Sequence, residues 1–256
     1  MDADDLTYAG YLDLERVLSA QHPRSDAHDE MLFIVIHQAS ELWLKLMLHE
    51  LGAARDRIAA DDLRPAFKML SRVSRAQTQM ITSWDVLATM TPIEFNGMRP
   101  ELGTSSGFQS HQYRMLEAVL GARDPKHLAR FAREPVFHAA LAAEYARPGI
   151  YDVALGLLRQ RGFDIPERPE HPDAHVEAAW MAIYRDPTRY FDLYELAEKL
   201  VDLEYNLQRW RFGHLKTVER IIGFKRGTGG SAGTAYLGAV LKLVFFPELL
   251  SVRTAL

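Results

Sequence analysis

Apolar residues recur every three or four positions along most of the chain, which is the spacing of one face of an α-helix. Runs that alternate apolar and polar residues, as half-buried strands do, are few. The predicted fold class is therefore all-α. The spacing predicts long helices over residues 29–59, 64–91, 110–122 and 188–222 and shorter ones over 126–133, 134–145 and 150–161.

The longest apolar stripe belongs to the predicted helix over 188–222. At about 1.5 Å per residue this helix would span roughly 50 Å, enough to be the spine of a bundle. His214 lies inside the stripe. Its members are Tyr190, Leu193, Leu196, Leu200, Leu203, Leu207, Trp210, His214, Val218 and Ile221.

Two stretches interrupt the helical pattern. Residues 91–110 contain two prolines and three glycines, which predicts a long loop, and residues 162–175 contain three prolines, which predicts an irregular surface connection. Residues 110 to about 122 and 188 onward flank a region of shorter helical pieces. We therefore expect one domain over 1–256 with an inserted helical segment at about 122–180.

Composition and charge narrow the class of protein. A formal net charge of -4 provides no positive electrostatic field to bind a nucleic acid backbone, so no nucleic-acid partner is expected. The first residues are acidic and lack the features of a secretory signal, which favours a cytoplasmic protein. The most apolar run, 234–250, is interrupted by Lys242 and Pro247 and is too short to cross a bilayer, so no membrane partner is expected.

The absence of cysteine excludes disulfides, Cys-ligated zinc, iron–sulfur clusters and thiolate haem. One interpretation of His214 is a core histidine bonded to a neighbouring helix. The other is an axial haem ligand, because Gly213 leaves room for a flat group beside the imidazole. Without cysteine, such a haem would be the non-covalent b type.

Further polar residues lie in apolar or glycine-rich settings. Phe33 and His37 share a helix face. One interpretation of His37 is a satisfied core histidine, and the other is a pocket imidazole that uncharged surroundings keep neutral and able to form one hydrogen bond. The loop GFKRGTGGSAG, residues 223–233, does not fit the Walker pattern, but it could fold over a small molecule and offer the hydroxyl of Thr228. An inward-facing Arg99 would clamp a carboxylate. Di-iron, zinc-protease and nucleophile-elbow motifs are absent from the sequence.

Four blocks of the chain together resemble the tryptophan 2,3-dioxygenase family, which consists of helical haem enzymes. They run in the order of the family from one end of the chain to the other, and the poorest match is residues 122–180. The blocks are TYAGYLDLERVLSAQHP, DEMLFIVIHQASELWLKLMLHEL, FNGMRPELGTSSGFQSHQYRMLE, and WRFGHLKTVERIIGFKRGTGGSAG with the FFPELLSVRT tail.

The resemblance implies a bundle around a b-type haem, with His214 as the proximal iron ligand and His37 as the distal histidine facing the substrate's indole N–H. It implies that Phe33 lines the indole pocket, Arg99 binds the substrate carboxylate and Thr228 meets its ammonium group.

It further implies that Phe95 lines the substrate pocket, at a position where the family has Tyr or Phe. Tyr8, Tyr11 and Leu12 match residues that reach a neighbouring subunit's site in the family, which implies a homotetramer.

The implied activity is a dioxygenase reaction in tryptophan catabolism by the kynurenine pathway. O2 would be inserted across the C2–C3 bond of the indole of L-tryptophan on ferrous haem, giving N-formylkynurenine. A haem monooxygenase that hydroxylates a tryptophan derivative, or another aromatic amino acid, is the nearest alternative. A ligand-sensing helical protein and a coiled-coil interaction protein are alternatives from other classes.

Overall fold

The computed structural model of the chain describes residues 7–230 and 233–256, and within these ranges it contains helices and no strand, which confirms the all-α prediction. The long helices are α3 (Glu30–Ala59), α4 (Leu63–Leu87) and α11 (Phe191–Ile222). The shorter α-helices are α1 (Tyr8–Tyr11), α2 (Leu14–Leu18), α5 (Pro92–Met98), α6 (His111–Leu120), α7 (Pro125–Arg130), α8 (Pro135–Tyr145), α9 (Ile150–Gln160), α10 (Ala174–Arg185), α12 (Thr234–Val240) and α13 (Pro247–Ala255). The 3-10 helices η2 (Arg99–Leu102) and η3 (Gly107–Gln109) lie between α5 and α6.

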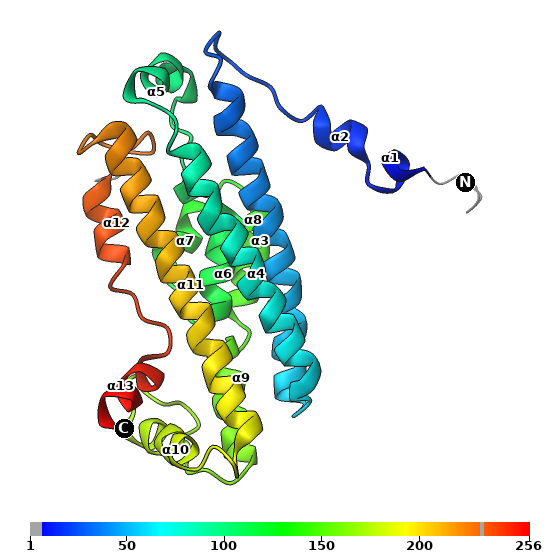
Figure 1. Cartoon of the computed structure of the whole chain (residues 1–256), viewed down its shortest axis with the longest axis vertical. Coiled ribbons are helices and arrows are strands. Elements are labelled where there is room, and N and C mark those ends of the chain that lie inside the picture. The colour runs from blue at the N-terminus through cyan, green and yellow to red at the C-terminus, as the bar shows by residue number, and fades with distance from the viewer. Residues whose placement is uncertain (1–6, 231–232) are drawn as a thin grey trace.

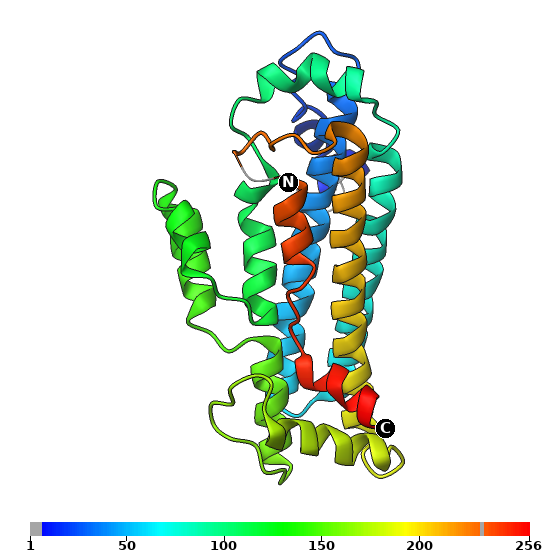
Figure 2. The ribbon, with the colours of Figure 1, turned by 90° about the vertical axis from the view of Figure 1, so that its left-hand side faces the viewer.

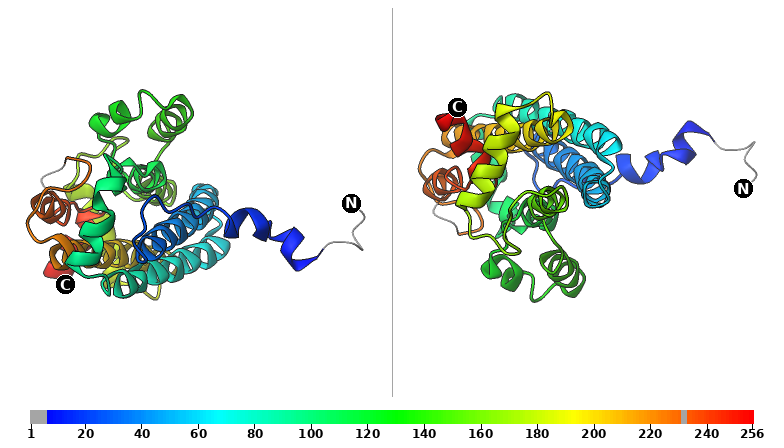
Figure 3. Two further views of the ribbon diagram at one scale, coloured as in Figure 1. Left: turned by 90° about the horizontal axis from the view of Figure 1, so that it is seen from above. Right: turned by 90° about the horizontal axis from the view of Figure 1, so that it is seen from below.

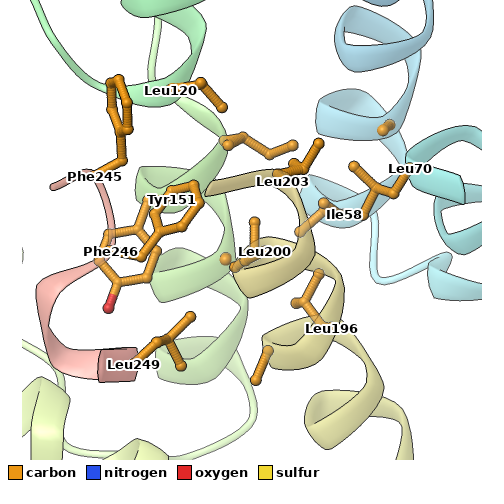
Figure 4. Packing of buried hydrophobic residues seen from close by; sticks show 14 of the residues in the cluster. Ile58, Leu70, Leu120, Tyr151, Leu196, Leu200, Leu203, Phe245, Phe246 and Leu249 are labelled. Atoms are coloured by element: carbon orange, nitrogen blue, oxygen red, sulfur yellow. The ribbon is translucent and has the colours of Figure 1, made fainter. Parts of the chain in front are cut away.

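The three long helices lie side by side along the long axis of the molecule (Figure 1). Their apolar stripes face one another, because a helix of this length is stabilised mainly by packing of its apolar face. Figure 4 shows part of this core, with Ile58 of α3, Leu70 of α4 and Leu203 of α11 lying between the helices. Helix α11 therefore runs along the bundle with its apolar stripe in the core, as predicted.

The chain between α12 and α13 is held on α11 by hydrogen bonds. The Glu204 carboxylate accepts from the backbone N–H groups of Phe245 and Phe246, both at 3.0 Å. Gln208 Nε2 donates to the carbonyl oxygen of Leu243 at 2.7 Å. Burial raises the pKa of Glu204 above its ordinary value, and the two N–H groups and Arg211 oppose that shift. The C-terminal part of the chain is thus fixed along the spine.

A second buried carboxylate, Glu248 in α13, joins the C-terminus to α9 and α10. It accepts from Tyr151 Oη at 2.9 Å and from the backbone N–H of Asp173 at 2.9 Å, and it lies 2.7 Å from His171 Nδ1. Trp180 Nε1 donates to Tyr151 Oη at 3.0 Å. These bonds hold α9, α10 and α13 together at one end of the molecule, the lower end in Figure 1.

The segment predicted as an insertion, residues 122–180, contains α7, α8, α9 and the first half of α10. Helices α7 and α8 project at the side of the bundle (Figure 2), whereas α9 packs against α3 and α6. A buried ion pair between Arg55 of α3 and Glu144 of α8 fixes the projecting part. Helices α6 to α8 enclose a small separate core, formed by Ala118, Phe131 and Leu141.

The predicted long loop over 91–110 is wrong in part, because α5, η2 and η3 lie within it. Thr91 and Glu94 form a reciprocal capping box that starts α5. Ser106 and Gln109 form the same arrangement at η3. Short helices of this kind depend on local caps, which the spacing of apolar residues does not reveal.

The N-terminal helices α1 and α2 extend away from the bundle (Figure 3). Their apolar side chains are largely uncovered, with Tyr8 exposed by 77% and Tyr11 by 73%. Helix α3 also carries exposed apolar residues on its outer side, namely Met31, Val35, Leu42 and Leu46. Together these residues form an uncovered apolar surface on the single chain.

Helix α3 is long and apolar enough to cross a membrane by length and composition alone. One such helix is weak evidence for a membrane span, because core helices of soluble proteins meet the same criterion. The inner face of α3 packs along α4, α6 and α9. A neighbouring protein on its outer face would account for the exposed apolar residues as well as a membrane would.

Candidate active site

A cavity of about 750 Å³ lies between α3, α4, α6, α11 and α12. It occupies the α5 end of the bundle, opposite the end formed by α10 and α13 (Figure 1). Its volume is within the range of roughly 300–1,000 Å³ that is typical of small-molecule and cofactor pockets. By area the surface that lines it is mostly apolar, although nearly half of the lining residues are polar or charged and can orient a ligand.

His214, on α11, faces this cavity and makes no hydrogen bond with the part of the chain that the structure describes. Burial lowers the pKa of His214 to about 4, and the nearby His37 adds to the effect. The imidazole is therefore neutral at neutral pH and has a lone pair available. A neutral, unpartnered imidazole facing a cavity is a suitable ligand for a metal centre.

Trp84 of α4 fixes the orientation of the His214 ring. The two rings are parallel, with an interplanar angle of 2° and centroids 4.8 Å apart. Trp84 Nε1 donates to the carbonyl oxygen of Trp210 at 3.0 Å, which holds the indole in place. Stacking covers a face of the imidazole and leaves its ring nitrogens, which lie on the edge, free to bind.

The role inferred for Gly213 needs correction. The sequence suggested that this glycine leaves room for a flat prosthetic group, but the room is filled by Trp84. A Cβ atom at position 213 would lie 2.7 Å from Trp84 Cδ1. Gly213 therefore serves the stacking of Trp84 on His214.

His37, on α3, lines the same cavity. Its Nδ1 lies 2.7 Å from the carbonyl oxygen of Phe33, and because a carbonyl can only accept, Nδ1 carries the hydrogen. Burial lowers the pKa of His37 below its ordinary value, against smaller opposing effects of Phe33 and Glu41. The neutral ring thus presents Nε2 as an acceptor, suited to an N–H donor.

Two phenylalanine rings lie in the same part of the cavity as His37. The Phe33 ring centroid is 4.1 Å from that of His37 and 6.2 Å from that of Phe95. Phe95 is buried, and the Cζ atom of Arg99 lies 5.9 Å from its ring centroid. The structure therefore brings the predicted pocket residues together, with Phe33 beside the imidazole, Phe95 beside Phe33, and all three lining the cavity.

Arg99 and Thr228 come from distant parts of the chain and line the cavity together. Arg99 Nη2 donates to the carbonyl oxygen of Arg226 at 2.6 Å, and no carboxylate pairs with Arg99 among the described residues. Thr228 Oγ1 donates to the carbonyl oxygen of Ser105 at 2.6 Å. Arg99 thus keeps donors for a carboxylate, and the Thr228 oxygen keeps lone pairs for an ammonium group.

The glycine-rich loop lies directly on the segment between η2 and η3. A Cβ atom at position 229 would lie 2.6 Å from Ser106 Cβ, so only glycine permits this contact. Together with the bond from Thr228 to Ser105, this packing closes one side of the cavity. The described part of the loop therefore lines the cavity, through Gly227, Thr228 and Gly233.

A buried charged cluster forms another wall. Arg211 Nε donates to Tyr113 Oη at 3.0 Å, and Arg211 Nη2 lies 3.0 Å from a carboxylate oxygen of Glu117. Arg114 pairs with the other oxygen of Glu117. Burial, and then Glu117, raise the pKa of Tyr113 to about 12, so its hydroxyl stays protonated. Arg114 and Arg211 thus share the Glu117 carboxylate, and Arg211 also interacts electrostatically with Glu204, so this wall carries buried charges of both signs.

The predicted residues Tyr8, Tyr11 and Leu12 do not join this cavity. They lie on and just after α1, which projects away from the bundle (Figure 1). Within one chain they therefore have no part in the site.

Sequence reasoning missed Trp84 and the charged cluster. For Trp84 the sequence holds no clear signal, since its role depends on the packing of α4 against α11. For the cluster a signal exists. Arg211 lies four residues after the buried Leu207 and four before the buried Leu215. The spacing therefore places a charged residue on the buried face of α11, which is unusual without a partner.

Fold and site together define the class of this protein. It is an all-α protein whose bundle encloses a largely apolar pocket between two neutral imidazoles, with cations placed for acidic groups.

Comparison with known proteins identifies the family. A sequence profile described as tryptophan 2,3-dioxygenase matches residues 1–148 and 165–256. A protein named tryptophan 2,3-dioxygenase from Erythrobacter litoralis is 65% identical, over 99% of this chain and 100% of the relative. One of the same name from Bacillus cereus is 55% identical, over 99% of this chain and 94% of the relative. The chain belongs to the tryptophan 2,3-dioxygenase family.

A protein named tryptophan 2,3-dioxygenase 1 from Ralstonia nicotianae is 53% identical, over 98% of this chain and 88% of the relative. These matches confirm the resemblance inferred from the four sequence blocks, and they make the chain an oxygenase. The stretch that the family profile leaves unmatched, residues 149–164, falls inside the segment predicted as an insertion.

Proposed function

We propose that this enzyme is a haem-dependent dioxygenase that inserts O2 across the C2–C3 bond of the L-tryptophan indole ring, giving N-formylkynurenine. The observation that carries the proposal is the position of His214 and His37, two neutral imidazoles on different helices that line one cavity. The relatives named tryptophan 2,3-dioxygenase supply the substrate class.

The donor set suits haem better than a metal bound by protein alone. Among the described residues no group of three or more His, Asp or Glu side chains could hold a metal ion. A metal that brings its own four nitrogen ligands needs only one imidazole, which His214 offers. When bound, ferrous haem would supply the activation of O2, which amino-acid side chains cannot provide.

Acidic groups of such a cofactor have partners at the cavity wall. Trp210 Nε1 and Arg114 Nε are buried and without a hydrogen-bond partner in the described chain, and both residues line the cavity. Buried donors of this kind are normally satisfied. These two unpartnered donors suit the carboxylates of a b-type haem.

The protein's own part of the reaction is mainly to position the substrate. His37 Nε2 would accept the indole N–H, while Phe33 and Phe95 would contact the ring. Arg99 would bind the carboxylate, and Thr228 Oγ1 would accept from the ammonium group. Since an indole N–H is a very weak acid, His37 would hold this hydrogen bond without removing the proton.

The uncovered apolar surface supports association with further copies of the chain, and the resemblance to the family implies that the copies number four. Tyr8, Tyr11 and Leu12 do not line their own cavity and are exposed, the two tyrosines largely so, which makes a neighbouring chain the natural contact for them. We place them at the substrate pocket of the adjacent subunit in a cytoplasmic homotetramer.

The test is anaerobic reduction of the haem-loaded protein, followed by addition of L-tryptophan and ¹⁸O2. Ring-opened product that carries two labelled oxygen atoms is the expected result. One labelled atom in a hydroxylated product would support the monooxygenase alternative instead, and failure to bind added haem would overturn the assignment of His214.

A further inference from the structure

The two histidines of the cavity differ in the backbone carbonyl that lies one helical turn before each ring. His37 Nδ1 donates to the carbonyl oxygen of Phe33, four residues earlier, at 2.7 Å. For His214 the residue four positions earlier is Trp210, and its carbonyl oxygen accepts from Trp84 Nε1 at 3.0 Å. The kind of acceptor that His37 uses is therefore already occupied by another side chain at His214.

The Trp210 carbonyl oxygen has no lone pair left for the imidazole. Trp210 and His214 both lie inside α11, where the backbone N–H of each residue donates to the carbonyl four residues before it. A carbonyl oxygen has two lone pairs. The backbone N–H of His214 takes one, and Trp84 Nε1 takes the other. The imidazole of His214 accordingly forms no hydrogen bond with the described part of the chain.

The neighbouring side chains do not replace this acceptor. A side chain on a helix leans over the preceding turn, so the His214 ring lies toward the turn of Trp210 and Arg211. Trp210 Nε1 and the Arg211 guanidinium can only donate hydrogen bonds, and so can Trp84 Nε1. The hydroxyl of Thr217 lies on the following turn. Among the described residues, the side chains on this turn therefore offer donors and no acceptor to the imidazole.

The occupied carbonyl depends on a close fit between α4 and α11. The Trp84 ring is parallel to the His214 ring, with centroids 4.8 Å apart. A Cβ atom at position 213 would lie 2.7 Å from Trp84 Cδ1. Gly213 thus allows the indole to lie against α11, where its N–H reaches the carbonyl of Trp210.

The hydrogen bond that His214 lacks would change the properties of an iron bound to it. A histidine that binds a metal usually donates its other ring N–H to a carbonyl, a carboxylate or water. That bond raises the basicity of the ligand, and a more basic ligand stabilises ferric iron relative to ferrous iron. A histidine without the bond is a weaker electron donor, which leaves the reduction potential of the iron higher.

We propose that Trp84 is a positioning residue that keeps His214 a weakly basic ligand and thereby favours the ferrous state of the haem. It does so by occupying the carbonyl oxygen of Trp210, the acceptor that the imidazole N–H would otherwise use. The inference rests on the proposed function, because it takes His214 as the iron ligand and ferrous haem as the form that the reaction requires.

The experiment compares the reduction potential of the haem in three proteins by spectroelectrochemical titration without oxygen. Trp84→Phe keeps a ring beside His214 but lacks the indole N–H, so the Trp210 carbonyl becomes available. At a fixed potential its ratio of ferrous to ferric haem should be about tenfold lower than in the wild type, equivalent to about 59 mV. The control Trp43→Phe removes a partly buried indole that does not line the cavity and should keep the wild-type potential.

A second readout reports on the bond between the iron and the imidazole. Resonance Raman spectra of the ferrous protein give the iron–histidine stretching frequency, which should be higher in Trp84→Phe because a more basic ligand binds iron more strongly. A further replacement of Trp84 by 3-benzothienylalanine keeps the shape of the indole and has sulfur in place of the N–H. It should change the potential and the frequency in the same directions as Trp84→Phe.

Three results would overturn the inference. The first is an unchanged potential in both replacements of Trp84. The second is a lower potential with an unchanged iron–histidine frequency, since the cause would then be the polarity around the haem. The third is loss of haem from the 3-benzothienylalanine protein while the wild type retains it, because the N–H would then serve to hold the site together. Failure of the wild type itself to bind haem would instead overturn the proposed function.

Discussion

At the scale of single residues, two histidines of the same site differ in what their surroundings leave free. Burial lowers the pKa of both rings, so both are neutral at neutral pH. His37 is bonded through Nδ1 to the Phe33 carbonyl, which fixes its tautomer. His214 has no such bond and is oriented by stacking on Trp84. The first is therefore suited to accept a hydrogen bond and the second to bind a metal.

Replacing His214 by alanine removes the only side-chain metal ligand proposed for this site. We expect the His214→Ala variant to bind haem at least about tenfold more weakly, while remaining folded. Haem per chain can be measured from the visible spectrum after gel filtration. The control variant is His49→Ala, which removes an exposed histidine that does not line the cavity. It should keep a full complement of haem. Normal haem content in His214→Ala would disprove the ligand assignment.

The His37→Ala variant should keep its haem and turn over roughly tenfold more slowly, because one hydrogen bond to the substrate is lost. The wild type should also lose activity in acid as His37 becomes protonated and Nε2 ceases to accept. Since burial lowers its pKa, this loss should have its midpoint below the ordinary value of 6.5. The pH profile of kcat/KM checks this, and the acid limb should be absent from His37→Ala.

Arg99 is expected to act on the substrate carboxylate alone. The Arg99→Met variant should show a kcat/KM for L-tryptophan lower by roughly 10- to 100-fold, the cost of one charge-assisted bond. Binding of tryptamine, which lacks the carboxylate, should be nearly the same in both proteins. An equal loss for both compounds would indicate a structural role of Arg99.

At the scale of elements, the approach of α11 to α4 depends on one glycine. Gly213→Ala would place a methyl group against Trp84, whose ring is stacked and hydrogen-bonded and cannot easily move. We expect a loss of about 1–3 kcal/mol in the free energy of unfolding and weaker haem binding. Denaturant titration measures the first effect. In the control, Gly52→Ala, the added methyl meets nothing within 4 Å inside α3, so stability should rise by about 0.5–1 kcal/mol.

The sequence predicted the long helices well, because each repeats its apolar positions over many turns. Helix α11 begins three residues later than predicted and ends at Ile222, as expected. Helix α4 ends at Leu87 and not at Thr91, since Thr91 caps the next helix and Pro92 starts it. The short helices after it are specified by caps and prolines, and these signals do not appear in an apolar periodicity.

The candidate site could be predicted residue by residue, but its assembly could not. A resemblance to the family marked His37, Arg99, His214 and Thr228, whose separation along the chain is large. These residues line one cavity because α3, α4 and α11 pack together, and this tertiary packing cannot be read from the sequence pattern. For the same reason the sequence did not reveal Trp84 as the group beside Gly213.

At the scale of the whole molecule, the proposed tetramer makes each site depend on two chains. Mixing can test this. A His214→Ala chain lacks its own site but keeps its N-terminal residues, and a Tyr8→Ala/Tyr11→Ala chain keeps its site but lacks the tyrosines. Each alone should have little activity, and mixed tetramers, formed by refolding or co-expression, should regain a fraction of it. Absence of any recovery would place these tyrosines outside the neighbouring site.

The hydrogen bonds that hold the C-terminal segment on α11 have a consequence during synthesis of the protein. Helix α12 forms one wall of the main cavity, and its far end is fixed through Glu204, Gln208 and, beyond them, Glu248 in α13. A ribosome releases these residues after α11, so a nascent chain can build α3, α4 and α11 while the cavity still lacks that wall. The pocket is enclosed only once α12 and α13 have docked on α11, so we expect firm retention of a cofactor to follow that docking.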